Sequence, residues 1–195
     1  MPTLRPFRDY NEKDVINLFS YSGAVIDTTY QIQATKGTLV KITGPGFVPS
    51  TEPIQMIGSY GNFQVNNFVA QRYGTVPAVT VAGPGDSPIG MLLFDVRELD
   101  ENLIPLKYNP RKAAEMEVAI SGTTVPIVTK GTFLYSGVVV SGAVPVTAGA
   151  PAYVTSSGLV TTSGANRIGK FLGATGAFTS GQDNSQMVVL YLNCQ

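Results

Sequence analysis

Short apolar runs alternate with turn residues throughout the C-terminal part of the chain, and this pattern is typical of β-strands. The runs are rich in Val, Ile, Leu and Phe, and Gly with Ser, Thr or Ala separates them. Many short strands with Gly-rich turns predict a small β-barrel or sandwich over residues 118–195. The predicted strands are Val118–Ile120, Val125–Thr129, Phe133–Val140, Ala152–Thr155, Leu159–Thr161, Ile168–Leu172 and Met187–Leu192.

Residues 25–96 show a looser version of the same pattern and are predicted to form a first β-rich module. Thr38–Ile42 alternates into a turn at Gly44-Pro45-Gly46. The other predicted strands are Thr28–Gln33, Val76–Val81 and Ile89–Val96, and Tyr60–Val69 is predicted as a partly exposed strand or an ordered loop.

The N-terminal residues 1–24 are predicted to form an extended arm and one short helix. Asn11 is a favoured N-cap, and Val15, Leu18 and Phe19 then follow at helical spacing as one apolar stripe. Before Asn11, Pro2 and Pro6 discourage a helix.

Within this arm, charged and aromatic side chains alternate at Arg5, Phe7, Arg8 and Tyr10. Two interpretations stay open. The segment is either a frayed terminus or an arm that becomes ordered on a neighbouring subunit, with these four residues as its anchors.

Charge is concentrated between the two β-rich parts. Asp95 to Glu117 holds ten of the 26 charged residues (13 basic and 13 acidic), together with Pro105 and Pro110. Charges of both signs mix here, which favours a solvated face. We therefore predict a linker over residues 97–117, with one helical turn at Arg111 to Met116.

One motif occurs twice, as Thr35-Lys36-Gly37-Thr38-Leu39-Val40 and as Thr129-Lys130-Gly131-Thr132-Phe133-Leu134. Two interpretations stay open for this motif as well. The chain either carries an internal duplication or uses Lys-Gly-Thr twice as a turn that leads into a strand.

Composition narrows the choice of partners. Only 13% of the residues are charged and the net charge is zero, about half the usual charged fraction of ~25%. This gives no electrostatic case for binding nucleic acid or an anionic membrane. A weakly charged surface is also poorly protected against association, so we expect partner proteins to cover much of it. The N-terminus lacks the apolar stretch of a signal peptide, and assembly in a cytoplasm is expected.

Candidate chemistry is sparse. The chain has no histidine, and its one cysteine is Cys194; sites built on His and Cys therefore find no support. Asp95, Glu98, Asp100 and Glu101 do not follow the calcium-loop pattern and are expected to be solvated. We expect no enzyme activity, no cofactor and no metal.

Four segments of the C-terminal part form a recognisable series: Glu117–Thr132, Val144–Val154, Arg167–Leu172 and Met187–Leu192. This series resembles the head decoration, or cement, proteins of tailed bacteriophages, and the likeness covers about residues 115–195. The opening stretch, from Arg8–Val15 to Leu39-Val40, is similar to phage structural proteins.

This resemblance implies a structural virion protein on the capsid exterior. Such a protein would bind the major capsid protein, stabilise contacts between capsid subunits and associate with itself as a dimer or trimer. Two alternatives remain. One is another β-rich virion component of the tail, baseplate or fibre. The other is a carbohydrate-binding β-domain, in which Tyr60, Phe63, Phe68 and Tyr73 would stack on sugars.

Overall fold

The computed structural model describes residues 4–6, 10–49, 75–139, 146–174 and 187–194. Within these ranges the fold is mainly β, as predicted, and consists of three sheets, short 3-10 turns and one α-helix. The predicted features at residues 60–69, and the residues Phe7, Arg8 and Tyr73, lie outside the described residues.

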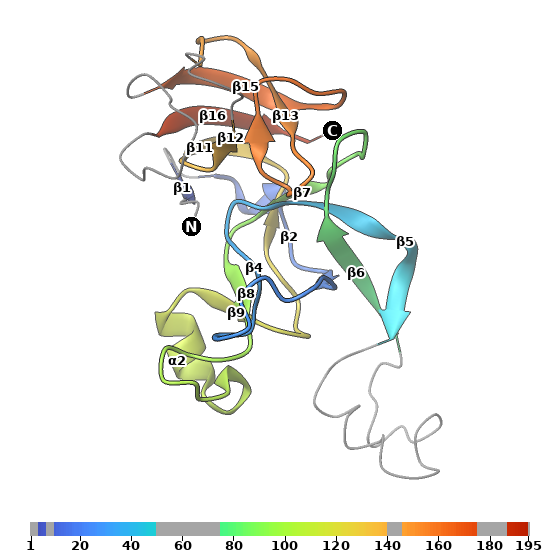
Figure 1. The fold of residues 1–195 in the computed structure, drawn as a ribbon, viewed down its shortest axis with the longest axis vertical. Coiled ribbons are helices and arrows are strands. Elements are labelled where there is room, and N and C mark those ends of the chain that lie inside the picture. The colour runs from blue at the N-terminus through green and yellow to red at the C-terminus, as the bar shows by residue number, and fades with distance from the viewer. Residues whose placement is uncertain (1–3, 7–9, 50–74, 140–145, 175–186, 195) are drawn as a thin grey trace.

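The first sheet contains the C-terminal strands and one strand from the N-terminus. It forms the upper end of the elongated molecule (Figure 1). In spatial order the strands are β1 (Leu4–Pro6), β11 (Lys130–Tyr135), β16 (Val188–Asn193), β15 (Arg167–Ala174), β13 (Pro151–Val154), β14 (Val160–Thr161) and β12 (Val138–Val139). Neighbouring strands run antiparallel except β14 and β12, which form a parallel pair at one edge.

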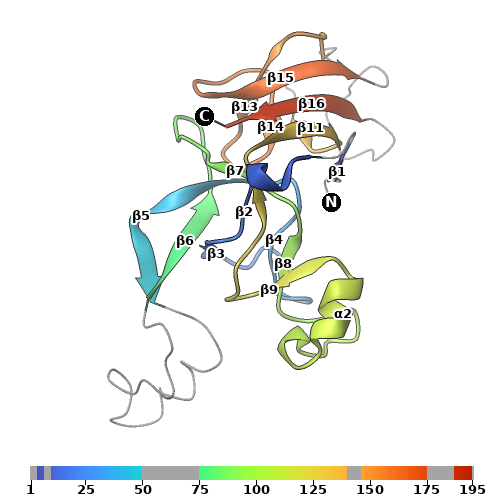
Figure 2. The same ribbon diagram turned by 180° about the vertical axis from the view of Figure 1, so that it is seen from behind.

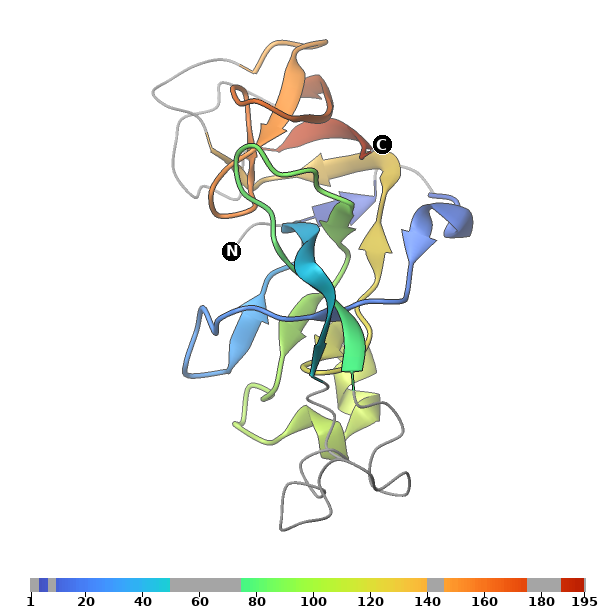
Figure 3. The same ribbon diagram turned by 90° about the vertical axis from the view of Figure 1, so that its right-hand side faces the viewer.

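The second sheet lies below the first along the long axis (Figure 3). It combines strands from the first half of the chain with one strand, β10, from beyond residue 118. In spatial order the strands are β2 (Val15–Ile16), β10 (Ile127–Val128), β7 (Gly90–Leu92), β5 (Leu39–Pro49), β6 (Thr75–Val81) and β3 (Ser20–Tyr21).

The third sheet is small and lies beside the helix. Its strands are β4 (Ile32–Ala34), β8 (Asp95–Arg97) and β9 (Val118–Ile120). Strands β8 and β9 run parallel, and the chain between them forms the 3-10 turn η2 (Leu106–Tyr108) and the helix α2 (Pro110–Glu115). A parallel pair requires such a crossover connection.

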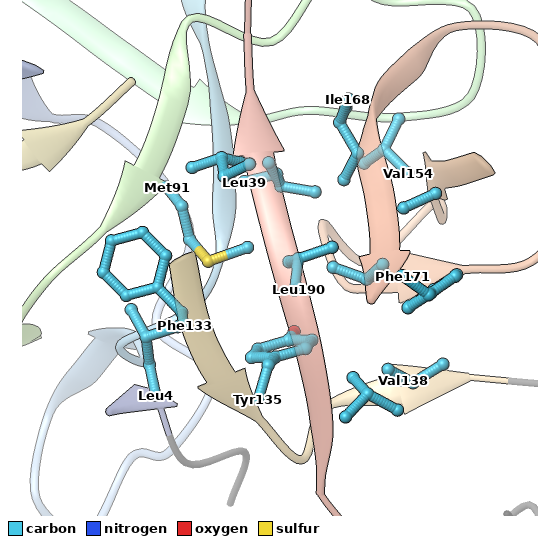
Figure 4. Packing of buried hydrophobic residues seen from close by; sticks show 14 of the residues in the cluster. Leu4, Leu39, Met91, Phe133, Tyr135, Val138, Val154, Ile168, Phe171 and Leu190 are labelled. Atoms are coloured by element: carbon cyan, nitrogen blue, oxygen red, sulfur yellow. The ribbon is translucent and has the colours of Figure 1, made fainter. Parts of the chain in front are cut away.

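The largest core lies between the first two sheets. Leu39 of β5 and Met91 of β7 are fully buried beside Leu190 of β16 (Figure 4). Phe133 and Phe171 complete its centre. Strands from both predicted β-rich parts therefore share one core, and whether residues 25–96 and 118–195 fold independently remains a prediction.

The C-terminal strand predictions are confirmed to within a few residues, with one refinement. The predicted strand Phe133–Val140 is two strands, β11 and β12. In the described part of the chain the sheets are open and none closes into a barrel.

The predicted N-terminal helix is wrong. Asn11 does cap, since its Oδ1 accepts a hydrogen bond from the backbone N–H of Lys13 at 3.0 Å, but the turn η1 (Glu12–Asp14) ends after three residues. Val15 and Ile16 then pair with β10, while Leu18 is 58% exposed. An isolated short helix is marginal in water. The edge of β10 instead offers the β-branched residues Val15 and Ile16 backbone partners in an extended conformation.

The predicted turn at Gly44-Pro45-Gly46 is also wrong. The chain continues through it as β5, and the register with β6 shifts between Ile42 and Phe47. A bulge uses the same residues that favour a turn, because it too leaves backbone groups out of the regular ladder.

The two copies of the repeated motif have different structures. The first copy forms a turn between β4 and β5, in which Gly37 has φ of 84° and lies against the ring of Tyr135. The second copy lies in β11, with Gly131 in the strand. The conformations are not equivalent, so the motif gives the duplication no structural support.

The segment predicted as a solvated linker is packed only in part, and the charged side chains of Glu101, Arg111, Glu115 and Glu117 are exposed. Leu106, Ala113 and Val118 form a small core of their own, and Asp100 is only 4% exposed. The helical turn predicted at Arg111 to Met116 is confirmed as α2, with Pro110 at its first position.

Candidate functional site

An open groove of about 800 Å³ separates the N-terminal turn from helix α2. Figure 2 shows η1, β2, β9 and α2 on the same side of the molecule. The groove is lined by Tyr10, Glu12, Val15, Asn17, Leu93, Phe94, Pro110, Ala113, Ala114, Val118, Ala119, Ile120, Thr123, Thr124 and Pro126.

The wall on the N-terminal side is held by hydrogen bonds to Thr129, which lies between β10 of the second sheet and β11 of the first. The carbonyl of Asp14 accepts from the backbone N–H of Thr129 at 2.8 Å and from its hydroxyl at 3.0 Å. Tyr10 packs on Phe133, with ring centroids 6.0 Å apart. These contacts hold η1 where the first two sheets meet and leave Glu12 exposed at the rim.

The opposite wall is helix α2. Asn109 caps it, because the Asn109 Oδ1 accepts from the backbone N–H of Lys112 at 3.3 Å. Ala113 is buried against Leu106, and Ala114 is exposed toward the groove. Two small side chains on this face leave space that larger residues would fill.

The lining is apolar and hydroxylic with one charge. Among its described residues only Glu12 is charged. No group of three or more His, Cys, Asp or Glu side chains that could hold a metal ion occurs in the part of the chain that the structure describes. The groove therefore suits an apolar side chain that has a cation beside it.

A projecting loop next to α2 is the second candidate feature. Leu103, Ile104 and Tyr108 are 54%, 52% and 77% exposed, and we call these three residues the apolar knob. Leu103 has φ of 63°, a left-handed conformation that a Leu seldom adopts.

Asp100 holds the knob in this conformation. Its Oδ1 accepts from the backbone N–H groups of Asn102 and Ile104, both at 2.8 Å. Its own backbone N–H donates to the Ile104 carbonyl at 3.0 Å, and that of Leu103 donates to the Asp100 carbonyl at 3.2 Å. The expectation that Asp100 is solvated is therefore wrong. Its carboxylate is buried and stabilises the loop through hydrogen bonds to the loop's own backbone.

Two of the predicted capsid-binding residues, Arg5 and Tyr10, lie within the described residues. Arg5 is exposed on the edge strand β1, whose first residue, Leu4, is buried in the main core. Tyr10 is half-buried against Phe133, so its ring already has a partner within the chain. Residues 4–6 are thus part of a sheet rather than a frayed terminus.

Sequence reasoning missed the groove and the knob. The groove joins residues from four separate segments, and no local signal brings them together. The knob did leave one signal: Asp-Glu-Asn at 100–102 has the composition of an Asx turn.

The buried ionisable groups have unreactive environments. Burial raises the pKa of Cys194 to about 12 and that of Tyr21 to about 12. Burial also raises the pKa of Tyr135, which the backbone at Val160 partly offsets. A thiol with so high a pKa carries little thiolate at neutral pH.

Comparison with known protein families, curated proteins and solved structures finds no match to this chain. Within the described residues, no helix is both long and apolar enough to cross a membrane.

Proposed function

We propose that this protein is a structural virion component that binds the outside of a phage capsid and stabilises contacts between major capsid subunits. The observation that carries the proposal is the resemblance of about residues 115–195 to capsid decoration proteins. Most of the segments that carry it contribute strands to one sheet, namely β11, β13, β15 and β16. In this proposal the open seven-stranded sheet takes the place of the family's small barrel.

Attachment through many modest contacts fits such a role. A capsid repeats the same subunit junction many times, and an interface of about 1,600 Å² per site is enough for specific attachment. Multiple engagement raises the overall strength without any single strong contact. The protein is further proposed to self-associate as a dimer or trimer.

The structure refines the part proposed for the N-terminal arm. Arg5 and Arg8 remain proposed capsid contacts, and Phe7 with them, whereas Tyr10 is already used within the chain. Deleting residues 1–10 would also remove Leu4 from the core and would confuse loss of binding with loss of stability. Arg5→Glu tests the arm better, because Arg5 is exposed and its neighbours keep their packing.

The test is reconstitution with empty, expanded capsids assembled from the major capsid protein encoded in the same genome. Co-sedimentation and electron cryomicroscopy should show added density at the junctions between capsid subunits. Arg5→Glu should weaken co-sedimentation at least several-fold and leave the unfolding midpoint unchanged, while the exposed control Lys170→Glu should bind normally. Absence of binding by the folded wild-type protein would contradict the proposed function.

A further inference from the structure

We propose that two copies of this chain form a two-fold symmetric dimer in which the apolar knob of each copy inserts into the groove of the other. The inference deepens the self-association included in the proposed function, and its test requires no capsid. Failure of the dimer and failure of capsid binding are therefore separate results.

The side chains of the knob are exposed and already held in place, as expected of residues that bind a partner protein. Exposed apolar side chains at a rigid tip contribute most to protein interfaces when they enter a pocket. Leu103 keeps its left-handed backbone because Asp100 holds the loop at both ends. Backbone strain of this kind costs about 1–3 kcal/mol and is concentrated at functional sites. In this protein the strained residue is an exposed leucine on an exposed loop, and the hydrogen bonds of Asp100 hold it there.

The groove has the complementary properties. Its apolar surface comes mainly from β2, β9, α2 and the residues Leu93 and Phe94 between β7 and β8. Its volume of about 800 Å³ can admit the side chains of a loop tip. The small residues Ala113 and Ala114 form its floor on the helix side.

Charge complementarity points to a second copy as the occupant. Glu12 is the single charge among the described lining residues of the groove, and Lys107 lies next to the knob, with its Nζ 5.1 Å from the centre of the Tyr108 ring. Within the described residues neither Glu12 nor Lys107 forms an ion pair. Insertion of the knob of one copy into the groove of another would bring Lys107 toward Glu12.

Symmetry follows from the position of α2. The helix comes directly after the knob in the chain and lines the groove. Knob and groove are thus adjacent features of one region, and a two-fold axis beside α2 makes both contacts at once. Such self-complementary interfaces form closed dimers.

Sedimentation equilibrium across a concentration series, with circular dichroism for folding, tests the dimer. Leu103→Gly is the sharpest variant because glycine accepts φ of 63° without strain. It should weaken dimerisation about tenfold or more without lowering the monomer's unfolding midpoint. Ala114→Arg, which blocks the groove from its exposed helix face, should weaken it similarly. The control Leu172→Ser removes a similarly exposed leucine from β15 and should leave the dimer intact.

A charge exchange tests the register. Glu12→Lys and Lys107→Glu should each weaken the dimer, and the double variant should recover most of the wild-type affinity. The proposal is overturned if the wild-type protein is monomeric up to high micromolar concentration or forms an assembly other than a dimer. It is equally overturned if Leu103→Gly and Ala114→Arg dimerise like wild type, or if the double charge variant is no better than the single ones.

Discussion

The seven-stranded sheet and the charged segment between β8 and β9 are stabilised in different ways. The sheet belongs to a core of seventeen described buried residues, and residues 118–195 contain only four charges. The charged segment contributes two buried residues, Leu106 and Ala113, to a small core that Val118 of β9 completes. It depends on local polar contacts: the Asp100 loop, the Asn109 cap and the Lys112–Glu101 ion pair. Exposed ion pairs contribute little, so the second region should open well before the first.

This difference suggests that the seven-stranded sheet maintains the fold, whereas the charged segment carries the surface that recognises a partner. A large, close-packed apolar core makes a region rigid. The charged segment projects the knob and one wall of the groove because its backbone is held by side-chain hydrogen bonds instead. Low local stability is common in binding loops.

The largest expected effect is in the main core. Phe171→Ala removes a fully buried ring and should lower the free energy of unfolding by about 3–5 kcal/mol. Urea denaturation followed by circular dichroism measures this free energy, and both sheets should unfold in a single cooperative transition. Leu172→Ala, the adjacent but 50% exposed position, should stay close to wild type. Equal effects at the two positions would contradict the position of this core.

A smaller and local effect is expected in the charged segment. Leu106→Ala empties the centre of its three-residue core and should cost about 2 kcal/mol, the low end for a buried leucine. Hydrogen exchange should accelerate at the amides of Ala113 and Met116, which are bonded within α2 and its cap, with little change in β16.

Tyr108→Ala, at 77% exposure, is the matched control for Leu106→Ala. If Leu106→Ala accelerates exchange in β16 as much as in α2, the two regions unfold as one unit and the contrast between them fails.

The smallest expected effect lies at the turn between β6 and β7, which contacts the first sheet, and it depends on pH. A hydrogen bond from Lys41, followed by one from the Gly83 N–H, lowers the pKa of the Asp86 carboxyl. The Asn166 side chain also donates to the Asp86 carbonyl at 2.7 Å. A lowered pKa means that the charged form stabilises the fold above the unfolded-state pKa, and that this contribution is lost as the pH falls through the lowered value.

Asp86→Asn should therefore lower the thermal midpoint slightly at pH 7 and match wild type at strongly acidic pH. Differential scanning calorimetry at several pH values measures it. Glu115→Gln, in the highly exposed Arg111–Glu115 pair, should show almost no change. A difference between Asp86→Asn and wild type that persists at acidic pH would show that the carboxylate's charge is not the cause.

The sequence by itself determined the strands after residue 117 and the helix α2. Short β-branched runs between Gly-rich turns have few alternatives to a strand, and Asn109-Pro110 is a strong helix start. These are local properties, and β13, β15 and β16 accordingly lie where the alternation predicts them.

Only the tertiary structure decided the pairing of distant segments. Val15 and Ile16 form a strand because they pair with the edge of β10. Leu4 is buried in the core because β1 pairs with the edge of β11. The burial of Asp100 and the walls of the groove arise the same way, from segments that meet only after folding. Hydrogen-bond partners and burial of this kind depend on contacts between residues far apart in the chain, which a local pattern does not contain.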